Sequence, residues 1–203
     1  MDNATRWKQE IKKLPIEDRK RDIVLAAARL FHRTGFHNTS MRDIAEEAGL
    51  AKGSIYHYFK RKDEILYFVL EEWVAMLSDR HDARVDEGAN PSELIEGVIS
   101  DIFELMAEHR GHVAAFFESY RDLADQDRSV VRDHRLIYRA KIEEAFRRGI
   151  KSGEFKEVDV KLATLALFGM CNWAYRWYTP DGPYSAKHVA SQFWLLFRDG
   201  VGP

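Results

Sequence analysis

The sequence has few of the features that mark specialised classes of protein. Its single cysteine, Cys171, excludes a disulfide within the chain and is typical of a protein in a reducing cytoplasm. No run of about 18 apolar residues occurs, so we expect no membrane span. The first ten residues, M-D-N-A-T-R-W-K-Q-E, have no apolar core of the kind found in export signals. We therefore expect a cytoplasmic protein.

Signals for an enzyme are equally sparse. Neither a glycine-rich phosphate loop nor a serine nucleophile motif is present. Glu108, His109 and His112 suggest a metal site, but two histidines without a third ligand in register favour surface residues. Cys171 lies in an apolar stretch without a nearby histidine, which favours a buried, inert thiol. We expect no catalytic residue, no metal and no cofactor.

Charge is unevenly distributed although the chain as a whole is close to neutral, at −2. Residues 1–63 carry a balance of +5, and the remaining residues carry −7. A basic front part attached to an acidic remainder is typical of a phosphate-binding module joined to a domain that does not bind nucleic acid. Chance unevenness is the alternative.

The stretch around which the chain is organised is residues 39–62, T-S-M-R-D-I-A-E-E-A-G-L-A-K-G-S-I-Y-H-Y-F-K-R-K. Its first part predicts a short helix over residues 41–48. Ser40 and Asp43 have the spacing of a reciprocal capping box, and the apolar residues fall on one helical face. Gly49 supplies the positive φ that ends such a helix.

The second part predicts another helix, which buries Ile55, Tyr58 and Phe59. Its other face is small, hydroxylated, aromatic and basic, without a carboxylate between residues 51 and 61. Such a face can bind a polyanion that also presents hydrogen-bonding groups. The two helices form a helix-turn-helix, in which the second is the reading element.

The run S-M-R-D-I-A-E-E-A-G-L-A-K-G-S-I-Y-H-Y-F-K-R-K-D-E-I-L, residues 40–66, resembles the DNA-binding signature of TetR-type bacterial transcriptional regulators. Ala51 and Arg61 depart from it, because these regulators often carry a Ser, Thr or Asn cap there. The missing caps predict fraying at two helix starts. The resemblance implies a homodimer that binds a palindromic operator in double-stranded DNA.

We expect the DNA contacts to divide by chemistry. Basic side chains should neutralise phosphates, two hydroxyls should donate hydrogen bonds, two residues should reach base edges, and one glycine should let the backbone approach closely. The expected phosphate contacts are Arg42, Lys52, Lys60 and Lys62. The hydroxyl donors are Ser40 and Tyr56, the base-edge contacts are Ser54 and His57, and the glycine is Gly53.

Periodicity predicts an all-α chain of about nine helices. This count matches what the resemblance implies, a TetR-like fold with three helices in the DNA-binding head and six in the body. We assign residues 1–15 to a basic arm, 16–62 to the head and 63–203 to the ligand-binding and dimerisation domain. In the arm, Trp7, Lys8, Lys12 and Lys13 are candidates for tracking DNA, and a solvated tail is the alternative. Expected body helices cover residues 62–85, 91–111, 113–123, 125–151, 158–178 and from 186 onward.

The helix expected over residues 158–178 is apolar on nearly all sides, so both faces need a cover. In the regulators that this sequence resembles, the last two helices of each subunit pair across a two-fold axis. The residues suited to that interface are Phe168, Gly169, Trp177, Phe193, Trp194 and Phe197.

A second set of aromatic and polar side chains predicts either a lined ligand cavity or a packed aromatic core, and as a set it favours the cavity. Its members are Trp73, Phe103, Phe116, Phe117, Tyr120, Arg121, Phe146, Asn172, Trp173 and Arg176. Arg176 needs an anionic partner, either the ligand or a carboxylate such as Glu118 or Asp122.

The run N-W-A-Y-R-W-Y-T-P-D-G-P-Y-S-A, residues 172–186, resembles regulators of fatty-acid or steroid catabolism, which implies an acyl-CoA thioester as the effector. The alternative is a regulator of efflux or detoxification that responds to a neutral or cationic lipophile, and a cation would want a carboxylate such as Glu118. A third possibility is an architectural DNA-binding protein without an effector.

Overall fold

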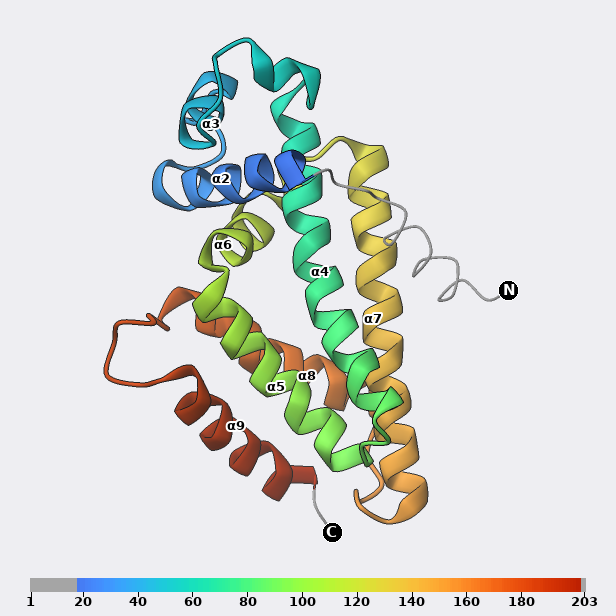
Figure 1. The fold of residues 1–203 in the computed structure, drawn as a ribbon. Helices are drawn as coiled ribbons and strands as arrows, with labels where there is room; N and C mark the ends of the chain where they lie inside the picture. The colour runs from blue at the N-terminus through green and yellow to red at the C-terminus, as the bar shows by residue number, and fades with distance from the viewer. Residues whose placement is uncertain (1–17, 202–203) are drawn as a thin grey trace. The chain divides into compact units, whose positions relative to one another are not determined.

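The computed structural model describes residues 18–201, and this part of the chain is all-α, as the sequence predicts (Figure 1). In chain order the elements are α2 (Asp18–Thr34), α3 (Met41–Glu47), η1 (Ser54–His57), α4 (Lys62–Asp86), α5 (Pro91–Glu108), α6 (Arg110–Glu118), η2 (Tyr120–Asp122), α7 (Asp125–Ser152), α8 (Val160–Asn172), η3 (Trp173–Arg176) and α9 (Ala186–Val201). Within residues 18–201, no helix is both long and apolar enough to span a membrane. The expected basic arm, residues 1–15, lies outside the described residues.

The chain divides into two compact units, whose boundaries fall inside α4 and α7. Unit 1 comprises Met1–Ala75 with Arg110–Arg135, and unit 2 comprises Met76–His109 with Leu136–Pro203. Unit 1 therefore joins α6 and η2 to the helices of the expected head. The expected domain boundary between residues 62 and 63 coincides with the first turn of α4 and stays a prediction.

In unit 1, α2 packs on both α3 and α6. Ile23, Val24, Ala27 and Phe31 form the buried face of α2. The crossing of α2 and α6 is close, because a Cβ atom on Gly111 would lie 2.3 Å from the carbonyl oxygen of Ala28. Glycine is therefore required at position 111, where any side chain would push α6 away from α2.

Helix α3 begins and ends as the sequence predicts. The Ser40 side chain accepts a hydrogen bond from the Asp43 backbone N–H, and the Asp43 carboxylate accepts one from the Ser40 backbone N–H. The Ser40 hydroxyl also donates to the Asp43 carboxylate and is the main cause that lowers the pKa of Asp43, and the Ser40 backbone N–H adds to this effect. Gly49 has a φ of +66°, which closes the helix without a Cβ penalty. Ile44 and Ala45 are fully buried beneath it.

The reading element is shorter than the sequence pattern predicts. An α-helix is expected here, but residues Ser54–His57 form a single 3₁₀ turn. Its N-cap is Gly53, and no side chain accepts a hydrogen bond from the first turn. The first turn of the reading element therefore has no side-chain cap to stabilise it.

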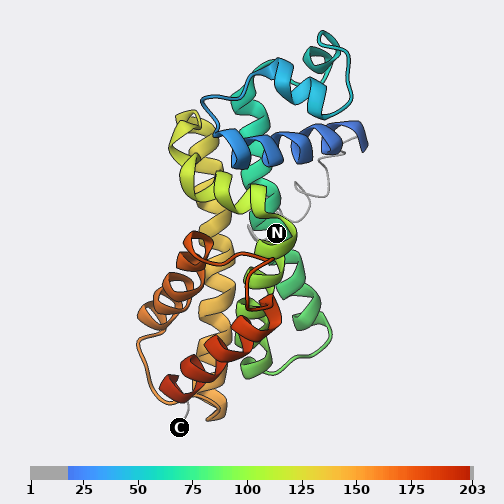
Figure 2. The same ribbon diagram turned by 90° about the vertical axis from the view of Figure 1, so that its left-hand side faces the viewer.

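In unit 2, α5 packs on both α9 and α8 (Figures 1 and 2). It begins with Asn90 as N-cap, Pro91 in the first position and Glu93 completing a capping box. Its buried Phe103 meets Tyr178 and Phe193 edge-on, with ring centres 5.8 and 5.1 Å apart. Aromatic contacts therefore fill the core between α5 and the C-terminal helices.

The helix expected over residues 158–178 is divided. Its α-helical part is α8, capped by the Asp159 side chain, which accepts a hydrogen bond from the Leu162 N–H. From Trp173 the backbone tightens into the 3₁₀ helix η3. Aromatic side chains lose rotamer freedom in α-helices. The run of Trp173, Tyr175 and Trp177 therefore weakens α-helix where the change occurs.

Buried charge in unit 2 is paired. The Asp101 carboxylate is 1% exposed and accepts two hydrogen bonds from Arg84, at 2.5 and 2.8 Å. The Lys141 ammonium donates to Asp82 at 2.8 Å and to the Ser78 hydroxyl at 2.6 Å. These pairs link α4 to α5 and α7. Removing one partner would leave an uncompensated buried charge, which is destabilising.

His81 makes the stability of this unit depend on pH. It is 3% exposed, and desolvation by burial is the main cause that lowers its pKa to about 4 from an ordinary value of 6.5. Between these two pH values, His81 is therefore protonated in the unfolded chain and neutral in the folded chain. Stability is complete above pH 6.5 and falls as the pH drops toward 4, by roughly 3 kcal/mol from this residue.

We expect His81→Phe to flatten the decline of the free energy of unfolding between pH 7 and pH 4.5, measured by urea denaturation. His188→Gln, which changes an exposed histidine of α9, is the control and should keep the wild-type profile. Parallel profiles for wild type and His81→Phe would show that His81 does not titrate on unfolding.

Candidate nucleic-acid interface and effector-domain surfaces

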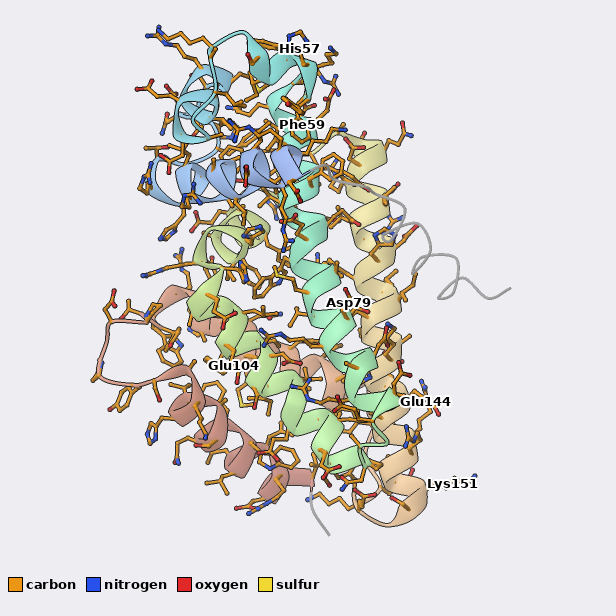
Figure 3. The ribbon with its side chains drawn as sticks, in the orientation of Figure 1. His57, Phe59, Asp79, Glu104, Glu144 and Lys151 are labelled. Carbon is orange, nitrogen blue, oxygen red and sulfur yellow. The ribbon has the colours of Figure 1, made fainter. Side chains whose placement is uncertain are left out.

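The head of unit 1 presents the expected reading face to solvent. Arg42, Lys52, Tyr56 and His57 are exposed, whereas Ile55 in the same turn is fully buried. Figure 3 marks His57 in η1 and Phe59, whose ring is buried, just after it. Among residues 18–201, no hydrogen bond or ion pair engages the side chains of Lys52, Tyr56 or His57. These groups are available to an external polyanion.

Three positions on this face have special geometry. Gly53 is exposed, and a Cβ there would meet no atom within 4 Å, so the surface beside it is open. Ser54 is half-buried. The Ser40 hydroxyl donates to the Asp43 carboxylate at 2.7 Å, so its proton is already used in the capping box.

The other basic groups of the head differ in their availability. The Lys60 ammonium is exposed and donates to the Tyr56 carbonyl at 2.7 Å. Arg61 forms ion pairs with Asp63 at 3.2 Å and with Glu64 at 3.7 Å. Lys62 is half-buried, and its ammonium donates to backbone carbonyls within the head. The number of basic residues in this part of the sequence is therefore larger than the number of positive charges free at its surface.

Helix α3 is held against α2 by charge as well as by apolar contacts. The Glu47 carboxylate accepts from Arg33 at 2.7 Å and from Arg29 at 3.1 Å. The Arg33 hydrogen bond is the main cause that lowers the pKa of Glu47. These two arginines hold α3 against α2. Sequence analysis missed this role, because the partners lie 14 and 18 residues apart.

The expected effector residues fall in both units. In unit 1, Trp73 and Phe116 are buried, Phe117 and Tyr120 are half-buried, and Arg121 is exposed. In unit 2, Phe103 and Phe146 are fully buried, Asn172 is half-buried, and Trp173 and Arg176 are exposed. That these ten residues line one cavity stays a prediction.

Unit 1 adds polar groups that sequence analysis did not identify. Arg135 lies over the rings of Phe116 and Tyr120, with its guanidinium carbon 4.9 and 5.4 Å from their centres. Successive residues of α4 reach two histidines: Glu71 hydrogen-bonds to His134, and Glu72 to His112 at 3.0 Å. The 63-residue and 40-residue separations leave no local signal for these pairs.

In unit 2, two of the expected effector residues serve the core. Phe103 packs as described above, and Phe146 contacts Phe155 and Phe197, with ring centres 5.6 and 5.9 Å apart. Arg176 lies over the Tyr175 ring, at 5.6 Å from its centre. No carboxylate of the described part of unit 2 forms an ion pair with Arg176, so its charge is available to an anion.

The residues expected at the dimer interface also divide. Trp194 is buried, and Phe168, Phe193 and Phe197 are half-buried, each of these three in contact with another aromatic ring of unit 2. Gly169 and Trp177 are exposed. The exposed apolar surface of α8 and α9 includes three leucines that sequence analysis did not single out: Leu162, Leu165 and Leu196.

This surface has the spacing of one helical face. Leu162, Leu165, Gly169 and Trp173 follow each other by three or four residues, and the three with side chains are 64%, 44% and 64% exposed. On α9, Leu196 is 72% exposed. The spacing was the signal that sequence analysis overlooked, because the aromatic residues dominated the pattern.

Other features of the described residues give less support for a functional site. A hollow at the turn between α4 and α5, lined by Arg84, Gly88, Glu93 and Gly97 among others, contains none of the expected effector residues. No group of three or more potential metal ligands occurs in residues 18–201. Cys171 is buried, and burial raises the pKa of its thiol to about 12.

Comparison with known proteins places both parts of the chain. Residues 23–67 match the family model described as bacterial regulatory proteins, tetR family. Residues 88–201 match the model described as tetracyclin repressor-like, C-terminal domain. The first match contains α3 and η1, and the second contains the exposed apolar surface of α8 and α9.

Individual relatives span nearly the whole chain. The HTH-type transcriptional repressor KstR2 of Mycobacterium tuberculosis (strain ATCC 25618 / H37Rv) is 30% identical over 188 residues, 92% of this chain and 94% of the repressor. The fatty acid metabolism regulator protein of Bacillus subtilis (strain 168) is 29% identical over 185 residues, 88% of this chain and 93% of the regulator.

Solved structures agree with these matches. The structure of the ketosteroid transcriptional regulator KstR2 of Mycobacterium tuberculosis aligns with a TM-score of 0.82, at 30% identity, over 92% of this chain and 96% of the other. AibR in complex with isovaleryl coenzyme A and operator DNA aligns with a TM-score of 0.78, at 25% identity, over 88% of this chain and 97% of the other.

The exposed reading face, the capping box that opens α3 and the two family matches lead to one assignment. The family consists of non-enzymatic DNA-binding transcriptional regulators that bind operator DNA as dimers. This chain belongs to the TetR family of bacterial transcriptional regulators.

Proposed function

We propose that this protein is a ligand-responsive repressor that binds a palindromic operator as a homodimer and is released by an acyl-CoA thioester. The observation that carries the DNA-binding part is the exposed face of η1, with Lys52, Tyr56 and His57 free of protein partners among residues 18–201. One 3₁₀ turn contacts too few bases for specificity, so two copies are needed.

On DNA, Arg42 and Lys52 lie on the exposed part of the head and neutralise phosphates, with Lys60 beside them. Ser54 and His57 reach base edges, and the open surface at Gly53 lets the backbone approach the major groove. Two such heads separated by one turn of DNA, about 34–36 Å, match successive major grooves on one side of the duplex.

Dimerisation follows from the uncovered face of α8 and α9. Leu162, Leu165, Trp173 and Leu196 expose 44–72% of their surface in the single chain. An exposed apolar patch of this kind marks an interface. A two-fold axis buries the same residues of both copies against each other. In this proposal the interior aromatic residues Phe193 and Phe197 support the surface from behind.

The acyl-CoA proposal rests on two supports. Relatives are named for steroid and fatty-acid regulation, and the AibR structure contains isovaleryl coenzyme A. In this chain, Arg176 is exposed, and its guanidinium has no carboxylate partner in the described part of unit 2. Arginine suits phosphate groups, because its fork donates to two oxygens at once.

A cationic or neutral lipophile is the second candidate. It is favoured by Glu71, which is 4% exposed and has one carboxylate oxygen without a hydrogen-bond partner in residues 18–201. A buried carboxylate of this kind attracts a cation. The expected alternative Glu118 is exposed, so it is less suited to that role.

Lys52→Ala tests the phosphate contacts. We expect weaker binding to every DNA sequence, with the slope of log K against log salt concentration reduced by about one in each head. Fluorescence anisotropy with operator and scrambled duplexes measures both. Lys151→Ala, which changes an exposed lysine at the end of α7, is the matched control and should leave the slope unchanged. A loss confined to one base position would contradict the phosphate role.

Leu165→Glu tests the dimer surface. Burying a carboxylate opposite its own two-fold copy is costly, so sedimentation equilibrium should give the mass of one chain where wild type gives two. Leu136→Glu is the control, since Leu136 on α7 has almost the same exposure, 43% against 44%. Equal dimerisation of both variants would place the interface elsewhere.

Palmitoyl-CoA tests the effector. Micromolar concentrations should release bound operator, which requires a coupling free energy of about 1–3 kcal/mol or more. Arg176→Gln should bind operator normally but need more palmitoyl-CoA for release. Palmitate with free CoA and a cationic dye form the comparison panel. Release by the dye alone would favour the cationic lipophile, and indifference to every acyl-CoA would remove the thioester from consideration.

A further inference from the structure

Lys62 opens α4, and its side chain turns into the head. The Nζ atom lies 2.5 Å from the carbonyl oxygen of Phe36, 2.8 Å from that of Thr39 and 3.5 Å from that of His37. It also lies 4.2 Å from the centre of the Phe36 ring. All these groups belong to the turn that joins α2 to α3.

These contacts use the donors of the ammonium group. A lysine has three N–H donors, and here three carbonyl oxygens surround them. The aromatic face of Phe36 adds a cation–π contact. Desolvation is the main cause that lowers the pKa of Lys62, and the charge of Asp122 opposes it. An ammonium held in this way has no donor left for a phosphate.

The turn is itself built to present these carbonyls. Gly35 has a φ of +82°, which ends α2, and the Thr39 hydroxyl donates to the Gly35 carbonyl at 2.8 Å. Thr39 is 3% exposed, and its hydroxyl also meets that of Thr34 at 2.9 Å. Hydrogen bonds within the turn therefore hold these carbonyl groups in place without Lys62.

The neighbouring lysines of the head behave differently. Lys52 is exposed, and no hydrogen bond or ion pair within residues 18–201 engages its ammonium. The ammonium of Lys60 is exposed and has one backbone contact. Only Lys62, among these three, joins two segments more than 20 residues apart. The three lysines share a charge, but two of them face the solvent and one faces the fold.

We propose that Lys62 is a positioning residue, which pins the turn between α2 and α3 to the first turn of α4 and does not contact DNA phosphate. Helix α3 starts two residues after Thr39, so the position of its N-terminus depends on this contact. A displacement of the start of α4 is then carried directly to α3. Lys62 contributes to DNA binding through the orientation of α3 and η1.

Lys62→Met tests the proposal, because it keeps the aliphatic stem and removes the ammonium. We expect at least a tenfold weaker affinity for operator and a lower melting temperature. The slope of log K against log salt should equal that of wild type, since no phosphate contact is lost. Lys52→Ala should give the reverse pattern, with a reduced slope and an unchanged melting temperature. A reduced slope with an unchanged melting temperature in Lys62→Met would overturn the proposal.

Lys62→Arg provides a second test, which remains informative if Lys62→Met does not fold. A guanidinium keeps the charge and binds phosphate well, but its planar fork does not fit three converging carbonyls. The positioning role predicts that arginine fails to restore operator affinity, and full restoration would assign Lys62 to a phosphate.

Wild-type protein allows a third measurement, which needs no variant. In ¹⁵N-labelled protein, the Lys62 ammonium signal should be visible, through slow exchange with water, and should keep its shift when DNA is added. A Lys62 signal that appears only with DNA would contradict the proposal. This measurement does not depend on operator identity, so it is separate from the fate of the repressor proposal.

Discussion

The reading part of this protein consists of a seven-residue helix and a four-residue 3₁₀ turn, and neither is long enough to be stable alone. Everything in the head follows from this constraint. Ile44, Ala45, Ile55 and Phe59 are buried beneath the two elements. Around this small core, charged side chains from the longer helices fix the orientation, with Arg29 and Arg33 of α2 holding Glu47 of α3. The exposed face is therefore positioned by the buried core beneath it and by the arginines of α2.

Contacts within the protein also engage much of the positive charge of the N-terminal part of the chain. Arg29, Arg33 and Arg61 are paired with carboxylates, and the Lys62 ammonium is turned toward backbone carbonyls. Counting basic residues therefore overstates the field that DNA meets. On the expected reading face, Lys52 lies two residues before η1 and has no partner among residues 18–201, which suits a site where phosphate contacts fix the register for a small number of base contacts.

In unit 1, helix α4 makes the contacts on which the proposed effector response depends. Its first residue is bound to the turn before α3, and two successive glutamates further along are hydrogen-bonded to His112 on α6 and His134 on α7. Buried polar contacts of this type have discrete geometries, because a partly broken contact leaves an unsatisfied group. In the proposed response, a helix held by such contacts is suited to shift between discrete positions.

The sequence by itself determined the fold class, the family and the cap of α3, because each depends on patterns within a short stretch of the chain. It predicted a full α-helix where the chain forms η1, and it did not resolve which apolar residues of α8 and α9 face outward. Only the tertiary structure decided that the Lys62 ammonium faces the fold, that Phe103 and Phe146 pack in the core, and that Glu71 and Glu72 find histidines. The groups lie 23 residues apart for Lys62 and Thr39, 40 and 63 for the two glutamate–histidine pairs, and 90 for Phe103 and Phe193, and no local pattern records a contact that only the packing of helices creates.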